Sequence, residues 1–207
     1  KTNDYLIKTG QASIEWAQGQ PEKWRPFWEG DAKGYYFIGK DNIPFHTMIW
    51  PAMLMGYDSL NLPYDVPANE FLTLQGGKFS TSRNWAVWLP DYLATYEPDP
   101  LRYLLSANMP ETADADFSWQ EFYRRNNDEL VATWGNLVHR VLTIIQRNFN
   151  GVIPHPFAQN GTDQGLLTKA EETFKAVDQS LSNCHFRDAI RSAMTLAQEA
   201  NRYLEEK

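Results

Sequence analysis

The sequence predicts an α/β part, incomplete as a doubly wound domain, followed by an all-α antiparallel helical bundle. In the first part, strand-like runs alternate with helical runs, an order typical of a mostly parallel sheet. Too few strands are visible for a complete domain of that type. From residue 118 onward, apolar residues recur at helical spacing, which indicates packed helices. The change of pattern divides the chain into residues 1–117 and 118–207.

The predicted elements of the first part are short and mixed in type. In order, they are a helix at residues 12–18, a strand at 35–38, an apolar helix at 43–55, a strand at 66–74, and helices at 85–96 and 100–107. Their strand–helix–strand–helix order is the observation that favours a parallel α/β arrangement.

A helix start is encoded at residues 116–122. Ser118, with Glu121 three residues later, indicates a capping box, and Phe117 with Phe122 can form a hydrophobic staple. Three apolar stripes follow, and residues 151–156 end the first of them. The stripes comprise Leu130, Trp134, Leu137, Val138, Val141, Leu142 and Ile145; Leu167, Ala170, Phe174, Val177 and Leu181; and Phe186, Ile190, Ala193, Ala197, Ala200 and Leu204. Three or four antiparallel helices account for them.

The net charge is −7, which at face value disfavours nucleic acid as a partner, but the charge is uneven. Residues 1–118 carry 9 basic and 15 acidic side chains, a balance of −6. Residues 119–207 carry 10 basic and 11 acidic side chains, a balance of −1. The nearly neutral second half can therefore still present arginine faces to phosphate or to bases.

Length and composition indicate a well-packed protein of one large or two small domains, with 207 residues, 43% hydrophobic and 14% aromatic. No apolar run approaches the roughly 18–20 residues that cross a membrane. We expect no signal peptide, because no apolar stretch follows residues 1–4. Cys184 is the lone cysteine, which excludes an internal disulfide and a cysteine-rich zinc site. We therefore expect a cytoplasmic protein with no metal site and no membrane partner.

Residues 76–84 form a polar, glycine-opened loop between two apolar segments. Gly76 and Gly77 let backbone N–H groups approach a ligand, and Lys78 supplies a positive charge. Three hydroxyl residues follow Lys78, and a helix predicted directly after the loop would direct its N-terminus at an anion. This composition fits a phosphate site, and it also fits a plain solvated connection.

Two sets of residues spaced four apart fall on one face of a predicted helix. Asn42, His46 and Trp50 form the first set, which is typical either of an ordinary amphipathic helix with a core tryptophan or of a pocket wall. Asn136 and Arg140 form the second set, which is typical of a solvated helix face. The residues alone leave these alternatives open.

Over about residues 12–207, the chain contains eight short blocks whose residues, order and spacing resemble the methionyl-tRNA synthetase family of class I aminoacyl-tRNA synthetases. The blocks are residues 36–46, 49–54, 78–83, 99–103, 110–112, 116–119, 127–130 and 134–140. Any one block has little specificity, whereas their order over most of the chain is highly specific. The resemblance implies the second half of a class I nucleotide-binding catalytic domain, joined to an anticodon-binding helical bundle.

The resemblance implies that residues 78–82 are the KMSKS-type signature loop of the family. This loop closes over ATP and helps to neutralise pyrophosphate as the amino-acid carboxylate attacks the α-phosphorus. Lys78, Ser80 and Ser82 stand at signature positions, and Thr81 replaces the second lysine. These four residues are the expected catalytic residues. A hydroxyl at position 81 can still donate a hydrogen bond to a phosphate oxygen.

The resemblance also implies the residues that bind each substrate. ATP is expected as a substrate, with Mg²⁺, and its expected contacts are Asp41, Leu72, Lys78 and Thr81. The expected methionine contacts are Asn42, His46 and Trp50, since an aromatic wall with few polar groups suits a thioether. The expected anticodon contacts are Asn136 and Arg140, since an amide and a guanidinium can bind unstacked base edges.

The function implied is that of a methionine–tRNA ligase, whose partners are methionine, ATP and tRNA(Met). The chain departs from the family in lacking the His-x-Gly-His tetrad, which holds the ATP phosphates, and the zinc-bearing insertion. We therefore expect a fragment that is inactive alone, with a bundle that is incomplete at its C-terminus. One alternative is a non-catalytic tRNA- or RNA-binding module derived from a synthetase. Another is a class I synthetase for a branched aliphatic amino acid, against which His46 and Trp50 argue.

Overall fold

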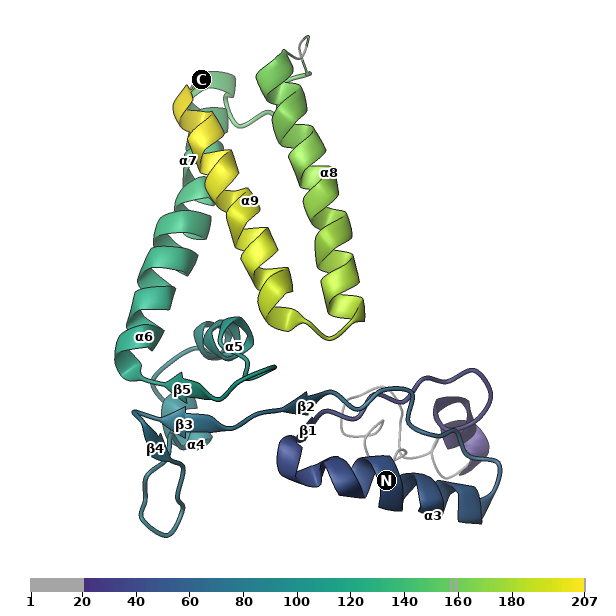
Figure 1. Cartoon of the computed structure of the whole chain (residues 1–207). Coiled ribbons are helices and arrows are strands. Elements are labelled where there is room, and N and C mark those ends of the chain that lie inside the picture. The colour runs from purple at the N-terminus through teal and green to yellow at the C-terminus, as the bar shows by residue number, and fades with distance from the viewer. Residues whose placement is uncertain (1–20, 157, 159, 207) are drawn as a thin grey trace. The chain divides into compact units, whose positions relative to one another are not determined.

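The structure of the chain is a computed structural model that describes residues 21–156, 158 and 160–206, with side chains from residue 24 onward (Figure 1). The chain forms two compact units, Lys1–Glu70 and Phe71–Lys207. The helix predicted at residues 12–18 lies outside the described residues. Within each unit, small sheets are combined with helices, which confirms the predicted fold class of an α/β part and a helical part.

The first unit contains a short parallel strand pair. After η1 (Pro21–Phe27), β1 (Ile38–Gly39) pairs with β2 (Ala68–Asn69) in the register Ile38 to Ala68. An isolated parallel bridge between Tyr35 and Asp65 precedes this pairing. The strand predicted at residues 35–38 is therefore confirmed as extended chain, although only its last residue lies in a strand.

A continuous helical segment follows β1, as predicted, but its centre is wider than an α-helix. It consists of η2 (Lys40–Asn42), the π-helix η3 (Phe45–Ile49) and α3 (Trp50–Tyr57). Pro51 has no N–H to donate to the carbonyl of residue 47, as an α-helix would require, and the π-helix lies directly before it. The segment ends at Asp58, whose φ of 71° is incompatible with helix.

The second unit contains a three-stranded sheet in the order β4-β3-β5. β3 (Leu72–Leu74) pairs antiparallel with β4 (Gly77–Lys78) and parallel with β5 (Ala115–Phe117). The single strand predicted at residues 66–74 is wrong, because its two ends lie in different sheets as β2 and β3. The backbone N–H of Phe71, between them, donates to the carboxylate of Asp114 instead of to a strand.

The helix predicted at residues 85–96 starts later than expected. Residues 85–88 continue the loop, because the N–H and C=O of Trp85 pair with Ser80. α4 (Leu89–Leu93) begins where Pro90 can occupy the first turn, and α5 (Pro98–Ala107) follows. These helices cover the sheet through one buried cluster, whose members are Leu74, Tyr92, Leu101, Leu104, Phe117 and Phe122.

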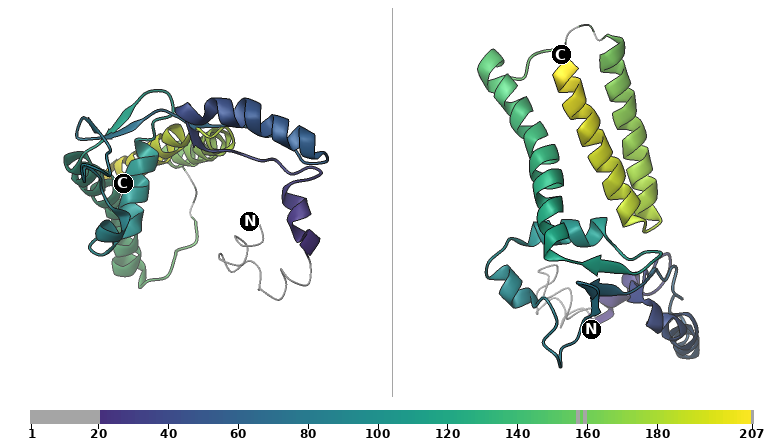
Figure 2. Two further views of the ribbon diagram at one scale, coloured as in Figure 1. Left: turned by 90° about the horizontal axis from the view of Figure 1, so that it is seen from below. Right: turned by 60° about the vertical axis from the view of Figure 1, so that its left-hand side comes forward.

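Beyond the sheet, the helices predicted after residue 118 are confirmed (Figures 1 and 2). α6 (Trp119–Arg124), η4 (Arg125–Gly135) and α7 (Asn136–Phe149) form one unbroken helical rod. α8 (Gly161–Ser182) and α9 (Phe186–Glu206) form an antiparallel pair in contact along their length. Two details differ from expectation. η4 is an 11-residue π-helix, and Trp134 and Leu142 of the first apolar stripe stay 53% and 60% exposed.

The predicted helix start at Ser118 is confirmed, but only half of the capping box forms. Ser118 Oγ accepts a hydrogen bond from the N–H of Glu121 at 3.2 Å. The Glu121 carboxylate turns away from the cap and binds Arg124 and Arg125 instead. Phe117 and Phe122, the predicted staple pair, both lie in the buried cluster. The cap therefore stabilises the start of the rod through Ser118 alone.

We expect Ser118→Ala to lower the free energy of unfolding by about 0.5–2 kcal/mol, because an N-terminal helix donor loses its acceptor. Denaturant titration followed by circular dichroism measures the effect. Ser182→Ala is the matched control, since Ser182 is exposed at the last residue of α8. Equal losses for the two variants would contradict a specific capping role.

Candidate functional site

The polar loop begins with a two-residue hairpin turn between β3 and β4. Gln75 and Gly76 both have positive φ values, 49° and 77°, as the tightest hairpin turns require. Gly77 lies against the Trp85 indole, and a Cβ added there would stand 3.1 Å from Trp85 Nε1. The glycine pair is therefore needed for the backbone path, one member for its φ and the other for close approach.

The base of the loop is fastened to the sheet by three hydrogen bonds. The N–H of Gln75 donates to Phe117 O at 2.8 Å, and the N–H of Gly76 donates to Asp116 Oδ1 at 2.8 Å. Trp85 Nε1 donates to Leu74 O at 3.1 Å from the far end of the loop. Because Leu74 and Phe117 are buried, the loop leaves from a rigid base.

The tip of the loop is exposed and rich in hydroxyl groups. Ser80 and Trp85 close it with two backbone hydrogen bonds of 2.9 Å. Ser80 Oγ lies 3.3 Å from Ser82 Oγ, and Thr81 and Ser82 are exposed. Lys78 is exposed on β4, opposite Thr73. The four predicted catalytic residues thus lie on one hairpin, and the exposed Lys78, Thr81 and Ser82 offer donors that a phosphate could reach.

One predicted feature of this loop is wrong. The sequence placed a helix directly after the loop, with its N-terminus available to an anion. α4 begins only at Leu89 and has 5 residues, so its N-terminus does not contribute to the loop tip. Leu72, expected beside the nucleotide, is half-buried and packs against the buried cluster. The groups of this loop that a phosphate could contact are therefore the Lys78 ammonium and the hydroxyl donors.

The second predicted set lies in the first unit, around an aromatic cluster that we define as Trp28, Tyr36, His46 and Trp50. The Tyr36 ring centroid lies 6.0 Å from that of His46 and 6.4 Å from that of Trp50. The Trp28 and Trp50 centroids are 6.1 Å apart. The sequence predicted His46 and Trp50 as site residues but not Trp28 and Tyr36. The aromatic run at residues 35–37 was a signal for Tyr36, whereas no local signal pointed to Trp28.

Two polar atoms of this cluster are notable. His46 Nδ1 lies 3.1 Å from Asn42 O, so the expected spacing of four is realised on the helix. Trp50 Nε1 is buried and has no hydrogen-bond partner among the described residues. A buried donor without an acceptor is costly, so Trp50 Nε1 is a group to which a ligand could supply an acceptor. Asn42 itself is exposed.

Asp41 is exposed at the start of the same helical segment. A Cβ added to Gly39 would stand 2.9 Å from Asp41 Oδ1, so the carboxylate lies close over the Gly39 backbone. The neighbouring Lys40 is paired with Glu70. Asp41 therefore lies beside the Gly39 backbone, on the same segment as Asn42.

The third predicted set lies at the start of α7. Asn136 is exposed, whereas Arg140 is half-buried and its NH1 lies 3.4 Å from three oxygens: Asn201 O, Asn201 Oδ1 and Glu205 Oε1. Asn201 Nδ2 also donates to Thr133 O at 2.9 Å, one turn before Asn136. Arg140 is thus oriented by α9, and the simple solvated face is wrong for it. Sequence reasoning missed Asn201, which is distant in the chain.

A charged network braces the rod where α6 meets η4. Arg124 binds both carboxylate oxygens of Glu121 at 2.8 Å, and Arg125 Nε binds Glu121 at 2.7 Å. These hydrogen bonds, that from Arg124 first, lower the pKa of Glu121. Burial, and then its hydrogen bond to Glu129 at 2.5 Å, raises the pKa of Tyr103. Both arginines are therefore engaged with carboxylates in this structure.

Two negative observations concern the described residues alone. Within them, no three His, Cys, Asp or Glu side chains are grouped so as to hold a metal ion. Among the helices that the structure describes, none combines the length and the apolar character needed to span a membrane.

Comparison with known proteins gives a consistent result. The family model described as tRNA synthetases class I (M) matches residues 3–142. A methionine–tRNA ligase of Thermomicrobium roseum is 58% identical over 200 residues, covering 95% of this chain and 34% of that protein. A methionine–tRNA ligase of Dehalococcoides mccartyi strain CBDB1 is 61% identical over 198 residues, covering 95% of this chain and 36% of that protein.

A solved structure is similar as well. The crystal structure of Mycobacterium tuberculosis methionyl-tRNA synthetase bound by methionyl-adenylate matches with a TM-score of 0.79 and 27% identity. The match covers 94% of this chain and 37% of that chain. The chain thus spans about a third of the length of the curated relatives it matches.

Proposed function

Since the chain belongs to the methionyl-tRNA synthetase family of class I tRNA synthetases, we propose that it is part of a methionine–tRNA ligase. That ligase activates methionine with ATP and transfers the aminoacyl group to tRNA(Met). The observation that carries the proposal is the loop of residues 76–85, which has a rigid base, an exposed lysine on β4, and a tip with three hydroxyl residues, of which Thr81 and Ser82 are exposed. Methionyl-adenylate, the ligand of the Mycobacterium tuberculosis relative, is the expected intermediate.

In the activation step, the methionine carboxylate attacks the α-phosphorus of ATP and pyrophosphate leaves. Negative charge develops on the leaving group, and Lys78 with the hydroxyls of Ser80, Thr81 and Ser82 is proposed to stabilise it. Thr81 supplies a donor but no charge, so Lys78 carries the main electrostatic effect. Mg²⁺ enters as part of the ATP substrate.

We propose that methionine binds beside His46 and Trp50 of the aromatic cluster, with Asn42 and Asp41 on the same helical segment. A thioether is polarisable and apolar, and it makes favourable contacts with aromatic rings. The buried and unpaired Trp50 Nε1 supports a role in ligand binding, because a bound molecule could supply the missing acceptor. Asp41 and Leu72 are the proposed contacts of the ATP ribose and adenine.

We propose that Asn136 and Arg140 read anticodon bases. Arg140 is oriented by Asn201 and Glu205 on α9, and a pre-oriented guanidinium loses less freedom on binding a base. We propose that residues 1–117 belong to the catalytic domain and residues 118–207 to the anticodon-binding bundle. This functional boundary differs from the boundary between the two compact units, which lies between Glu70 and Phe71. A cytoplasmic location is proposed because charging of tRNA supports protein synthesis there.

We expect Lys78→Ala to slow ATP–pyrophosphate exchange by about 10²- to 10³-fold, because the developing charge loses a positioned cation. The measurement uses the natural-length ligase that contains this chain, and the KM for methionine should not change. Lys169→Ala, in α8, is the control, since Lys169 is also exposed. A large loss of methionine affinity in Lys78→Ala would contradict the role given to Lys78.

We expect Arg140→Ala to weaken tRNA charging by about 1–3 kcal/mol, the usual cost of a lost base contact, while adenylate formation is unchanged. Steady-state aminoacylation and pyrophosphate exchange, measured on the same natural-length preparation, separate the two steps. Arg147→Ala is the matched control, two turns further along α7 and exposed. Equal loss in both steps would show that Arg140 acts through stability.

A second candidate is a non-catalytic RNA-binding module derived from a synthetase, in which the half-buried Arg140 oriented by α9 would bind RNA without catalysis. Under the main proposal, the 207-residue chain does not form methionyl-adenylate alone, because part of the phosphate site is missing. The natural-length protein does form it. We expect pyrophosphate exchange only from the natural-length protein. Exchange by the isolated chain would refute its inactivity, and exchange by neither would favour the module.

A further inference from the structure

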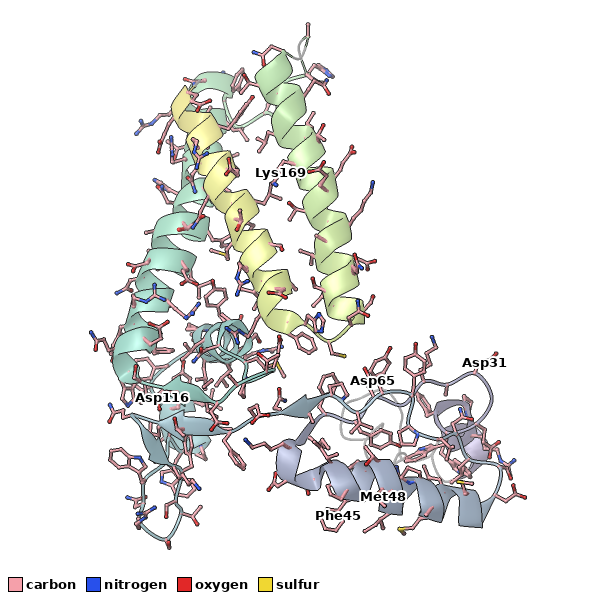
Figure 3. The ribbon with its side chains drawn as sticks, viewed as in Figure 1. Asp31, Phe45, Met48, Asp65, Asp116 and Lys169 are labelled. Atoms are coloured by element: carbon pink, nitrogen blue, oxygen red, sulfur yellow. The ribbon has the colours of Figure 1, made fainter. Side chains whose placement is uncertain are left out.

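Asp116 makes a contact that the chemistry described so far does not use. It lies at the centre of β5, where Figure 3 shows it beside β3 and the hairpin. Its Oδ1 accepts two hydrogen bonds, from the N–H of Gly76 at 2.8 Å and from Thr73 Oγ1 at 2.5 Å. One side chain of β5 thereby binds both the strand before the turn and the turn itself.

The path of the chain to Lys78 begins at the turn that Asp116 binds. Among the described strands, β4 has 2 residues and stands at the edge of the sheet, paired with β3 in the order β4-β3-β5. Its direction is therefore set by the positive-φ turn of Gln75 and Gly76. The two turn N–H groups are bound by successive residues of β5, Gln75 by Phe117 and Gly76 by Asp116.

The acceptor is itself held firmly, although its side chain is exposed. The carbonyl of Asp116 accepts a hydrogen bond from Asn108 Nδ2 at 2.9 Å. The next residue, Phe117, is buried, and Asp116 stands in register with Thr73 across the parallel pair. A carboxylate on such a rigid strand can fix a turn, because its own position changes little.

We propose that Asp116 is a positioning residue of the adenylation step. Its carboxylate fixes the Gln75–Gly76 turn and thereby the position of Lys78, without touching a substrate. The inference rests on the proposed function of the loop. A positioned charge is effective only near its productive geometry, and a displacement of about 1 Å can cost 10²-fold in rate. Asp116 thus sets the rate through Lys78.

The test compares Asp116→Ala and Asp116→Asn in the natural-length ligase, by pyrophosphate exchange and by peptide-resolved amide hydrogen exchange over residues 75–79. Asparagine keeps an oxygen acceptor at the same place and removes the charge. We expect Asp116→Ala to lower kcat about 10- to 100-fold at an unchanged methionine KM, with faster exchange at Gly76. We expect the kcat of Asp116→Asn to stay within about threefold of that of the natural protein. The asparagine oxygen keeps the hydrogen bond, although a bond to a neutral acceptor is about half as strong as one to a carboxylate.

Asp114→Ala is the matched control. Asp114 lies just before β5 and, like Asp116, accepts a backbone N–H, that of Phe71 at 3.0 Å, at the opposite end of β3 from the turn. We expect Asp114→Ala to catalyse ATP–pyrophosphate exchange at a rate near that of the natural protein. Thermal unfolding of every variant shows whether a loss of rate reflects loss of structure, and Asp116→Asn keeps the test valid if Asp116→Ala fails to fold.

Four results would overturn the inference. They are an unchanged rate in Asp116→Ala, equal slowing in Asp114→Ala, a raised methionine KM that accounts for the loss, and a slow Asp116→Asn whose Gly76 amide stays protected. The last would assign the effect to charge. Lys78→Ala, run in parallel, separates the two proposals. If Lys78→Ala is fast, the loop function itself fails; if Lys78→Ala alone is slow, only the role of Asp116 fails.

Discussion

The parallel pairing of β3 with β5 is the constraint on which the rest of the second unit depends. It places Leu74 opposite Phe117, and both side chains are buried in one cluster with residues of α4, α5 and α6. A parallel pair this short is marginal alone, so burial of these two side chains supplies its stability. The loop follows the last residue of β3, and Ser118, directly after β5, caps the start of the helical rod.

This arrangement separates rigid and accessible parts within one short segment of chain. The loop base is held by bonds to Phe117, Asp116 and Leu74, whereas its tip is exposed to solvent. Catalytic loops that close over a nucleotide need both properties, because the hinge must be defined while the tip moves. The same strand, β5, therefore controls the loop and starts the rod that carries Asn136 and Arg140.

The rod shows how distant residues set local geometry. η4 departs from α-helical geometry over 11 residues, and it ends directly before Asn136. Asn201 binds Thr133 O near that end and also contacts Arg140. Wide helical turns of this kind often occur at functional sites, and they persist when surrounding contacts compensate for poorer hydrogen-bond geometry. Here α9 supplies those contacts, so the proposed base-reading face depends on the packing of two helices.

The sequence by itself determined the helices after residue 118 and the loop of Gly76 to Asn84, because a repeated apolar period and a glycine pair before Lys78 are local signals. It did not determine the break between β2 and β3, the late start of α4 or the open half of the capping box. Each of these depends on a particular hydrogen-bond partner. Phe71 binds Asp114, which is distant in the chain, whereas Trp85 binds Ser80 and Glu121 binds Arg124, which are close in the chain. Only the folded structure decided which partner each of these groups binds, because hydrogen bonds and burial in the folded chain outweigh local propensity.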